Sequence, residues 1–245
     1  MVGYKTLTKT GRSLSSEYGE VYYPLPIDDK PGDWITVPGN GSYVAHEDGL
    51  FVGGIGDTLV KVECEDEVVV ETALVGVRCW RKVRILAVLP WTDLPVGVGE
   101  WRCRAARDIK CLTDDERRTL VLGIPEEQGK WRYWAALNIR RLTDEERRTL
   151  VFGIPEDQYQ WRCEAARLVN GLTDGERRTL VFGIPKEQGK LVYLAARYVE
   201  CLTDGERRSL VLSIPKEQRE WRRSAVLFIG CLTDEDRKTL RGDNK

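Results

Sequence analysis

The chain has 245 residues, of which 42% are hydrophobic, so it can bury one large core or two smaller ones. Its 38 basic and 39 acidic side chains give a net charge of −1, which excludes the strong basicity typical of non-specific nucleic-acid or membrane-surface binding. No apolar run approaches the roughly 18–20 residues that span a bilayer, and the N-terminus lacks the apolar core of a signal peptide. We therefore expect a soluble, cytoplasmic protein.

The cysteines and the single histidine argue against a metal site. None of the seven cysteines forms a Cys-x-x-Cys pair, and His46 is the only histidine. No metal or cofactor is predicted. Five cysteines fall at two equivalent positions of a repeat, where we expect small buried side chains kept reduced in the cytosol. They are Cys103 and Cys163 at one position, and Cys111, Cys201 and Cys231 at the other.

Residues 1–90 are rich in Val, Tyr, Thr and Gly and lack helical periodicity, which predicts a small β-rich domain. Turn-forming sequences such as Asp28-Asp29-Lys30-Pro31-Gly32 separate its short alternating or β-branched segments. The apolar segment 83–89 fits either a last strand or a connecting helix. The other predicted strands are 4–8, 20–25, 34–37, 42–45, 58–64, 67–72 and 74–79.

Several features of this domain have the residue types of a catalytic or phosphate site. The glycine-rich segment 53–57 lacks the lysine of a P-loop, so we interpret it as a tight turn. His46 could act as a general base beside Ser42 or Tyr43, but the sequence positions no nucleophile for it. A hypothesis of another class makes the domain a nucleotide-acting enzyme similar to ADP-ribosyltransferases. Its cleft would be lined by Arg12, Tyr43, His46 and Glu71.

A set of short motifs extends over residues 4–90: Lys5-x-Leu7, Gly11-Arg12-Ser13, Pro31-Gly32-x-Trp34, Val37-Pro38-Gly39-x-Gly41-x-Tyr43, Asp48-Gly49-Leu50 and Val68-Val69-Val70. This set resembles an uncharacterised domain family of bacteria and their phages. Members of that family carry an alanine-rich helical tail after a β-rich head. The resemblance therefore implies the same layout here, and it implies no particular activity.

Residues 91–111 repeat only half of the unit that follows them. Leu94-Pro95, Glu100-Trp101-Arg102 and Ala105-Ala106 match the second half of that unit, whereas residues 82–94 do not match its first half. We predict that this half-copy is an atypical cap that joins the β-rich domain to the repeats.

From Leu112 onward one phrase recurs every 30 residues, a period typical of stacked structural units. Copies begin at Leu112, Leu142, Leu172 and Leu202, with a truncated copy from Leu232. The second residue of each copy is a threonine, which is followed three residues later by Glu or Asp. This capping box predicts the start of a first helix, helix A. The threonines are Thr113, Thr143, Thr173, Thr203 and Thr233.

A glycine and a proline predict the corner between helix A and a second helix, helix B. We expect a left-handed C-cap at Gly123, Gly153 and Gly183, and the prolines at 125, 155, 185 and 215 in the first turn of helix B. Ser213 replaces the glycine in the fourth copy, so that turn is either not left-handed or strained. Gly129 and Gly189 predict a loose first turn of helix B. The tryptophans share a face with paired alanines, which places them in the core.

An arginine pair follows each capping box and is the most obvious charged feature. The pairs are 117/118, 147/148, 177/178 and 207/208. We favour ion pairs with the repeat's own aspartates and glutamates along the stack, because every arginine pair is accompanied by at least two acids. The alternative is a ladder of cations for phosphates, that is, nucleic-acid binding along the repeat arginines.

Together these patterns predict an α+β chain with a β-rich domain at 1–90, a half-repeat cap at 91–111 and an α-solenoid of about four 30-residue two-helix repeats at 112–245. Such stacks present long surfaces, so we expect a non-enzymatic protein that binds another protein, in a bacterial or phage defence, toxin or counter-defence system. The expected contacts lie where the copies differ. The candidates are Arg132, Arg162, Arg222, Tyr133, Tyr159 and Tyr193.

Overall fold

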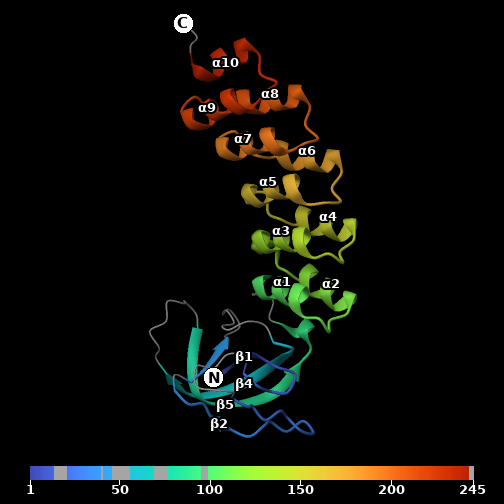
Figure 1. The fold of residues 1–245 in the computed structure, drawn as a ribbon, viewed down its shortest axis with the longest axis vertical. Coiled ribbons are helices and arrows are strands. Elements are labelled where there is room, and N and C mark those ends of the chain that lie inside the picture. The colour runs from blue at the N-terminus through green and yellow to red at the C-terminus, as the bar shows by residue number, and fades with distance from the viewer. Residues whose placement is uncertain (14–20, 40, 46–55, 69–76, 95–98, 243–245) are drawn as a thin grey trace. The chain divides into compact units, whose positions relative to one another are not determined.

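A computed structural model describes residues 1–13, 21–39, 41–45, 56–68, 77–94 and 99–242. It confirms an α+β chain, with an antiparallel sheet followed by helices (Figure 1). The chain divides into two compact units, Met1–Pro125 with Ile139–Arg141, and Glu126–Asn138 with Leu142–Lys245. This division falls inside the first repeat copy, because the half-copy and the first helix A group with the sheet. We describe each unit by itself.

The first unit contains a five-stranded antiparallel sheet. β1 pairs with β3 along one edge and with β4 along the other, and β5 also pairs with both β3 and β4. These pairings run around a closed ring, to which β2 adds at β5. Closure satisfies backbone groups that an open sheet would leave at its edges. The strands are β1 (Val2–Leu7), β2 (Ile35–Thr36), β3 (Ser42–Ala45), β4 (Thr58–Val68) and β5 (Val77–Leu89).

The core of the sheet comes from side chains that alternate along the strands. Val60 and Val62 on β4, and Val83 and Ile85 on β5, are buried, while the residues between them are more exposed. This period of two is what a pleated strand with one buried face requires. Leu7 at the end of β1 packs into the same cluster.

Most predicted strands are present among the described residues. β4 joins the predicted segments 58–64 and 67–72 in one strand that runs to Val68. Segment 83–89 is a strand, and it continues β5 from Val77. Residues 21–25 form only an isolated bridge between Arg12 and Tyr22. Pro24 and Pro26 explain this difference, because a proline has no amide hydrogen to donate to a ladder. The ends of the predicted strands at 69–72 and 74–76 lie outside the described residues.

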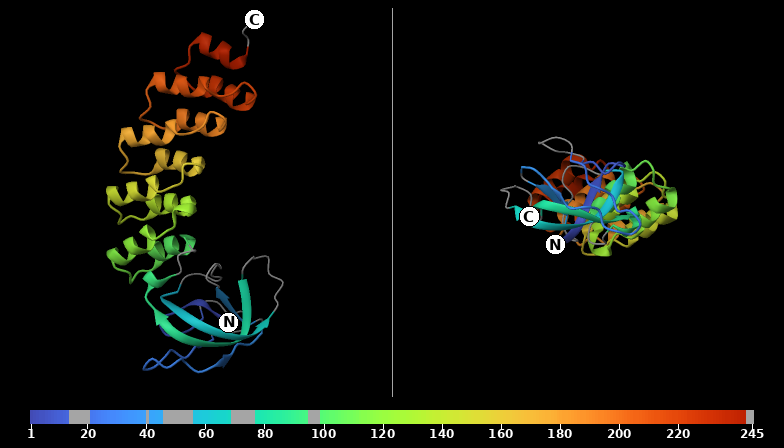
Figure 2. Two further views of the ribbon diagram at one scale, coloured as in Figure 1. Left: turned by 180° about the vertical axis from the view of Figure 1, so that it is seen from behind. Right: turned by 90° about the horizontal axis from the view of Figure 1, so that it is seen from below.

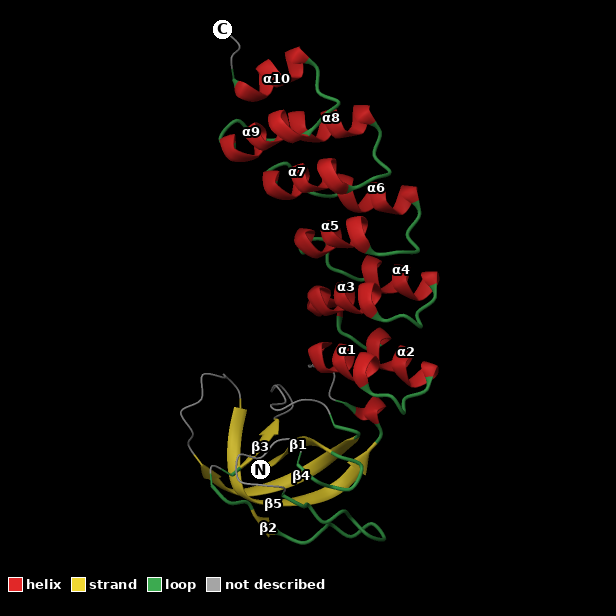
Figure 3. Cartoon of the chain, viewed as in Figure 1, coloured by secondary structure: helices red, strands yellow, loops and turns green. Residues whose placement is uncertain are grey.

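The repeats form pairs of short helices (Figure 3). A 3-10 turn, η1 (Trp91–Asp93), precedes α1 (Gly99–Asp108), which is helix B of the half-copy, and η2 (Glu126–Gln128) precedes α3. The A helices are α2 (Asp114–Leu122), α4 (Asp144–Phe152), α6 (Asp174–Phe182), α8 (Asp204–Leu212) and α10 (Asp234–Arg241). The other B helices are α3 (Gly129–Asn138), α5 (Tyr159–Leu168), α7 (Gly189–Tyr198) and α9 (Arg219–Phe228).

All five predicted capping boxes are confirmed. In each A helix the threonine side chain accepts a hydrogen bond from the amide three residues on, and the acid at that position accepts one from the threonine amide. In α4, for example, the Thr143 amide donates to Glu146 Oε2 at 2.6 Å. Two amides that the helix cannot satisfy are thus paired at every start. The A helices therefore begin at the same position of every copy and recur with the 30-residue period of the sequence.

The predicted left-handed corner is wrong. Gly123, Gly153 and Gly183 have φ of −79°, −81° and −77°, so their backbones do not need glycine. Ser213 has φ of −74°, and it fits the fourth corner without backbone strain. The glycines of the first two corners are instead required by a side chain that approaches them, as described below.

The prolines do not lie in helix B. The Pro155 carbonyl accepts from the Gln158 amide at 3.0 Å, which closes a separate turn, and α5 begins only at Tyr159. The loose start predicted for helix B is thus confirmed. Gly129 is the first residue of α3. A side chain does not fit at this position, because a Cβ there would lie 2.7 Å from Cγ2 of Ile154 in the next copy. Its role is close approach rather than flexibility.

In the second unit the helices follow one another in sequence order (Figures 1 and 2). Each helix B packs on the following helix A, and α3, α5, α7 and α9 also pack on one another in turn. The paired alanines, such as Ala165 and Ala166, are fully buried, which lets the helices approach closely. No helix in the described part of the chain has the length and apolarity that a membrane crossing requires.

Candidate interaction surfaces

The first arginine of each pair caps a helix rather than pairing with an acid. Arg177 donates to the carbonyls of Ala166 and Val169 at the end of α5, the latter at 2.8 Å. Arg207 does the same at the end of α7, through the carbonyls of Ala196 and Val199. Carbonyls at a helix C-terminus lack intrahelical partners and carry partial negative charge, which suits a cation. These guanidinium groups are therefore occupied inside the repeat.

The second arginine forms the predicted ion pair along the stack. In the second unit it binds the capping-box acid of the next copy: Arg148 with Glu176 at 3.0 Å, Arg178 with Glu206 at 2.9 Å, and Arg208 with Asp236 at 2.7 Å. Arg118 instead pairs with Asp115 in its own helix. Most guanidinium groups of the arginine pairs are thus engaged in contacts within the repeats. Few of them remain to bind phosphates, which weakens the nucleic-acid hypothesis.

Arg132 and Arg222, two of the predicted partner contacts, lie inside the repeat. Each is only 5–6% exposed, and each donates to the last carbonyls of the following helix A. Arg132 Nε reaches the Leu150 carbonyl at 3.1 Å, and Arg222 Nε reaches the Leu240 carbonyl at 2.9 Å. Burial lowers the pKa of Arg132. Its guanidinium group keeps hydrogen bonds to the carbonyls of Leu150 and Thr149. We therefore do not place these two residues in an interface.

The end of α8 is capped by different residues, one from the third copy and one from the fourth. Val192 stands where the other B helices carry arginine, so the carbonyl of Leu210 at the end of α8 has no guanidinium. The hydroxyl of Ser213, which replaces the corner glycine, donates to that carbonyl at 2.6 Å. Arginine with glycine at the ends of α2 and α4, and valine with serine at the end of α8, are therefore two alternative ways to cap a helix A.

Tyr133 and Tyr193 are also buried, and they join neighbouring B helices. The Tyr133 ring stacks on Trp161 with centroids 5.8 Å apart, and the Tyr193 ring lies 5.9 Å from Trp221. Among the tryptophans, Trp101 is buried as predicted, whereas Trp131, Trp161 and Trp221 are half-buried at the edge of the stack. Both tyrosines contribute to packing between copies.

Tyr159 and Arg162 are the predicted contacts that remain partly exposed. Tyr159 lines a hollow of about 480 Å³ between the starts of α5 and α7. Leu191 stands there in place of the tryptophan found in the neighbouring copies, and the smaller side chain leaves the space open. Arg162 makes only a long bond, 3.4 Å to the carbonyl of Ile154.

An exposed row of side chains that the sequence analysis missed lies at the C-terminal ends of α5, α7 and α9. Leu168, Tyr198 and Phe228 are the last residues of these helices and are 44%, 41% and 55% exposed. Arg167 lies 4.7 Å from the Tyr198 ring centroid, and Arg197 lies 4.9 Å from Tyr198 and 4.3 Å from Phe228. We call these five residues the aromatic stripe.

The cysteines are all unpaired. Cys103 and Cys163 are buried as predicted, and burial raises the pKa of Cys163 to about 12, so its thiol stays protonated and inert. Cys111 is exposed and Cys201 and Cys231 are half-exposed, contrary to the prediction, because they lie in the turn before helix A rather than in a helix face. Among the described residues no cluster of ligand-type side chains could hold a metal.

The enzyme hypothesis for the first unit cannot be placed on the structure. His46 and Glu71 and the loop at 53–55 lie outside the described residues, as does the side chain of Tyr43, and Arg12 is exposed. The first unit also buries a cluster of three polar side chains that the sequence did not indicate. Tyr23 Oη donates to Ser42 Oγ at 2.8 Å, and Lys5 Nζ lies 5.3 Å from the Tyr23 ring centroid. Burial lowers the pKa of Lys5 to about 8.

Comparison with protein-family models, with curated proteins and with solved structures found no significant match. The resemblance of residues 4–90 to a bacterial and phage family therefore stays an expectation. We infer the function from the geometry of the chain itself.

Proposed function

We propose that this is a non-enzymatic, cytoplasmic interaction protein whose repeats form an α-solenoid and bind another protein along the aromatic stripe. The single observation that carries the proposal is the contiguous exposure of Leu168, Tyr198 and Phe228 at one repeat position of three neighbouring helices. Exposed apolar residues are common singly, but a connected row of them is a feature of recognition surfaces.

The chemistry of the stripe suits protein recognition. Its two arginines lie against the aromatic rings, and Arg167 is also held by Glu164 at 2.9 Å. Side chains held in this way lose little conformational freedom on binding. Tyrosine and arginine are also enriched among the residues that dominate the binding energy of protein interfaces. A complementary partner segment would offer apolar side chains to the rings and carboxylates to the guanidinium edges.

The variation between copies supports the same surface. The last residue of helix B changes from Asn138 to Leu168, Tyr198 and Phe228 in successive copies. The residue that follows it is always a buried Ile or Val, as at Val169 and Val199. Packing in the core keeps the residue after helix B an Ile or a Val. The exposed last residue of helix B differs between copies, and the fold of the repeat does not require this difference.

The test is affinity capture from the native cell with the full chain and with two double variants of it. The first, Tyr198→Ser with Phe228→Ser, removes both rings of the stripe. The second, Phe152→Ser with Phe182→Ser, removes two rings of similar exposure at the ends of α4 and α6. Both changes lie at exposed helix ends, so helical circular dichroism should stay unchanged.

The proposal expects a specific partner that the full chain and the Phe152/Phe182 variant capture and that the Tyr198/Phe228 variant loses. Capture of that partner by all three proteins would show that the stripe is not the binding surface. Loss with both variants would show that the effect is not specific to the stripe.

A further inference from the structure

The junction between α5 and α7 is built from other residues than the two junctions beside it. Between α3 and α5, and between α7 and α9, the first helix starts with a glycine and carries a tyrosine that packs on a tryptophan of the second helix. At the α5–α7 junction the corresponding residues are Tyr159, Cys163 and Leu191. All three residues that make this contact elsewhere are therefore exchanged at one junction.

A glutamine that closes the neighbouring junctions lies outside this one. Gln158 and Gln218 each donate to a backbone carbonyl of the preceding copy and lie against the glycine that starts the preceding helix B. Tyr159 stands in place of that glycine at the start of α5, and its side chain takes the room that the glutamine needs. Gln188, the corresponding glutamine, is exposed and lines the hollow between α5 and α7.

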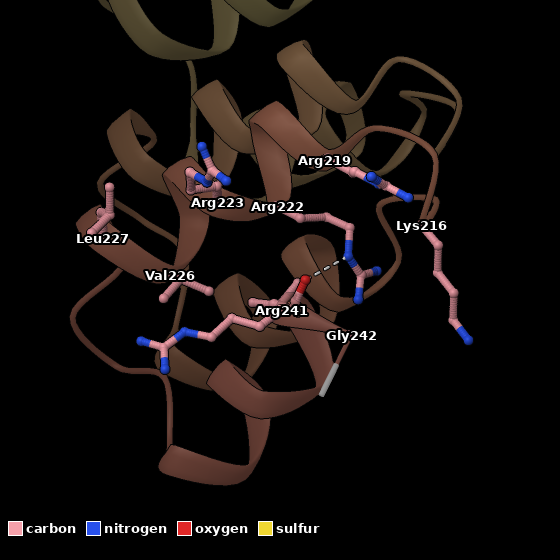
Figure 4. A pocket seen from close by; sticks show the side chains of 9 residues that line it. Lys216, Arg219, Arg222, Arg223, Val226, Leu227, Arg241 and Gly242 are labelled. Atoms are coloured by element: carbon pink, nitrogen blue, oxygen red, sulfur yellow. Dashed lines mark hydrogen bonds between the residues drawn. The ribbon is translucent and has the colours of Figure 1, made fainter. Parts of the chain in front are cut away.

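The third copy also lacks the arginine that follows the tryptophan, but the chain replaces only the arginine. Leu191 and Val192 stand where the fourth copy has Trp221 and Arg222. Arg222 donates to a carbonyl at the end of α10 at 2.9 Å (Figure 4). In the absence of such an arginine in α7, Ser213 caps the end of α8. The space of the missing tryptophan, in contrast, stays open as the hollow of about 480 Å³.

The walls of the hollow suit a small aromatic group. Trp161 and Tyr159 line it from the start of α5, and Leu191 and Leu194 line it from α7. Its volume falls within the roughly 300–1,000 Å³ usual for small-molecule sites, which combine apolar walls with a few polar groups. Trp161 is half-buried, and Tyr133 packs on its ring. This packing orients the Trp161 indole before any second ring arrives.

The charges around the hollow favour an uncharged ring over a cationic side chain. Asp157 and Glu164 line the hollow, as does Lys190. Glu164 is paired with Arg167 at 2.9 Å, and the charges of Asp157 and Lys190 balance each other. The lining therefore holds no net negative charge that would attract a guanidinium or an ammonium group.

We infer that this hollow binds a tryptophan side chain of a partner protein, which fills the space that the repeat's own tryptophan fills at the neighbouring junctions. The indole packs against Trp161 at the spacing of about 4.5–7 Å between ring centroids that is usual for aromatic pairs. The Gln188 side chain offers a carbonyl acceptor to the indole N–H group. The hollow shares no residue with the aromatic stripe, so the inference can hold or fail without the proposed function.

The probe is N-acetyl-tryptophanamide, which presents the side chain without any other partner contact. N-acetyl-leucinamide and N-acetyl-argininamide are the reference ligands. Each is titrated into the full ¹⁵N-labelled chain, and the readout is the indole N–H signal of Trp161, assigned with Trp161→Phe. Leu191→Trp restores the tryptophan and fills the hollow. Leu227→Trp makes the same replacement on α9 at a residue that is 67% exposed and does not line the hollow, so it is the matched control.

The inference expects N-acetyl-tryptophanamide to shift the Trp161 signal saturably and to bind at least about fivefold more tightly than N-acetyl-leucinamide. Leu191→Trp should weaken this binding at least about tenfold, and Leu227→Trp should leave it unchanged, with helical circular dichroism the same in both variants.

An absent shift, equal binding of the tryptophan and leucine amides, or an equal loss in both variants would overturn the inference. Tighter binding of N-acetyl-argininamide would assign the hollow to a cationic side chain and would overturn it as well. The comparison of the three amides uses the unmodified chain alone, so it tests the inference independently of how Leu191→Trp folds.

Discussion

The guanidinium group of Arg132 fills the space into which a side chain at residue 153 would project. A Cβ at Gly153 would clash with Nη2, Cζ and Nε of this arginine, which donates to the carbonyls of Leu150 and Thr149. The backbone at Gly153 has φ of −81°, a value open to any residue. Glycine at this position therefore leaves room for the Arg132 guanidinium, which in turn hydrogen-bonds the last carbonyls of α4.

Gly153→Ala should destabilise the second unit by about 1–3 kcal/mol. The new methyl group displaces the Arg132 guanidinium and leaves buried carbonyls and a buried cation without each other. Urea unfolding followed by helical circular dichroism measures the loss. Gly183→Ala is the matched control, because a Cβ there meets only backbone carbonyl oxygens at 3.4 and 3.8 Å. It should be neutral or stabilise by up to about 1 kcal/mol. Equal effects of the two substitutions would contradict this account.

Val192 and Ser213 should behave as a coupled pair. Val192→Arg alone brings a guanidinium against the serine side chain, and Ser213→Gly alone removes the hydroxyl that donates to the Leu210 carbonyl. Each single change should lower stability by about 1 kcal/mol, and the double change should recover most of the loss by recreating the arginine–glycine corner. A double-mutant cycle from urea unfolding gives the coupling energy. Strictly additive effects would show that the two sites do not act together.

The local parts of the repeat could be predicted from sequence, and the contacts between distant positions could not. Each capping box is set by a threonine and an acid three residues apart, so Thr143 and Glu146 carry their own signal. The glycine between helix A and helix B, such as Gly153, gives a misleading sequence signal, because glycine at a helix end usually indicates a left-handed cap. The useful signal lay in comparison of the copies, since Val192 in the third copy replaces the arginine, and Ser213 in the fourth copy replaces the glycine, that the other full copies carry at these positions.

The candidate surface was missed for a related reason. The varying positions chosen from sequence included Arg132, which varies between copies because its capping partner varies, and which is buried. Tyr198 and Phe228 vary at a position that packing leaves exposed, which only the structure could distinguish. In the first unit, Pro24 and Pro26 lie in or beside the predicted strand 20–25, so their lack of amide donors was a usable warning.

Two glycines, each near the start of a helix, should respond in opposite ways to replacement by alanine: one substitution should raise the stability of the protein and the other should lower it. Gly205 lies in the first turn of α8, and a Cβ at this residue would have no neighbouring atom within 4 Å. Gly205→Ala should therefore stabilise by roughly 0.5–1 kcal/mol through helix propensity. In Gly189→Ala the methyl group would meet Cγ2 of Ile214 at 3.0 Å and displace Gln218, which donates to the Glu187 carbonyl at 2.5 Å. This substitution should destabilise. Thermal unfolding of both variants, compared with the unmodified chain, checks the difference in sign.

The acid of the last capping box has a strongly perturbed pKa. Asp236 accepts from Arg208 Nε at 2.7 Å and from the Thr233 amide at 2.9 Å. The arginine contact, followed by the backbone bond, lowers the pKa of Asp236 to about 2. An aspartate in an unfolded chain titrates near 4. Its contribution to stability is therefore complete above about pH 4 and is lost as the pH falls toward 2.

Asp236→Asn should lower the melting temperature at pH 7, because it removes the charge that Arg208 binds and weakens the cap of α10. The difference from the unmodified chain should shrink as the pH falls from about 4 to 2, where the carboxyl group of the unmodified protein is itself protonated. Glu235→Gln, which neutralises an exposed carboxylate of the same turn, is the matched control and should change the melting temperature little at either pH. A constant difference between Asp236→Asn and the unmodified chain across this range would mean that the substitution acts through packing rather than through charge.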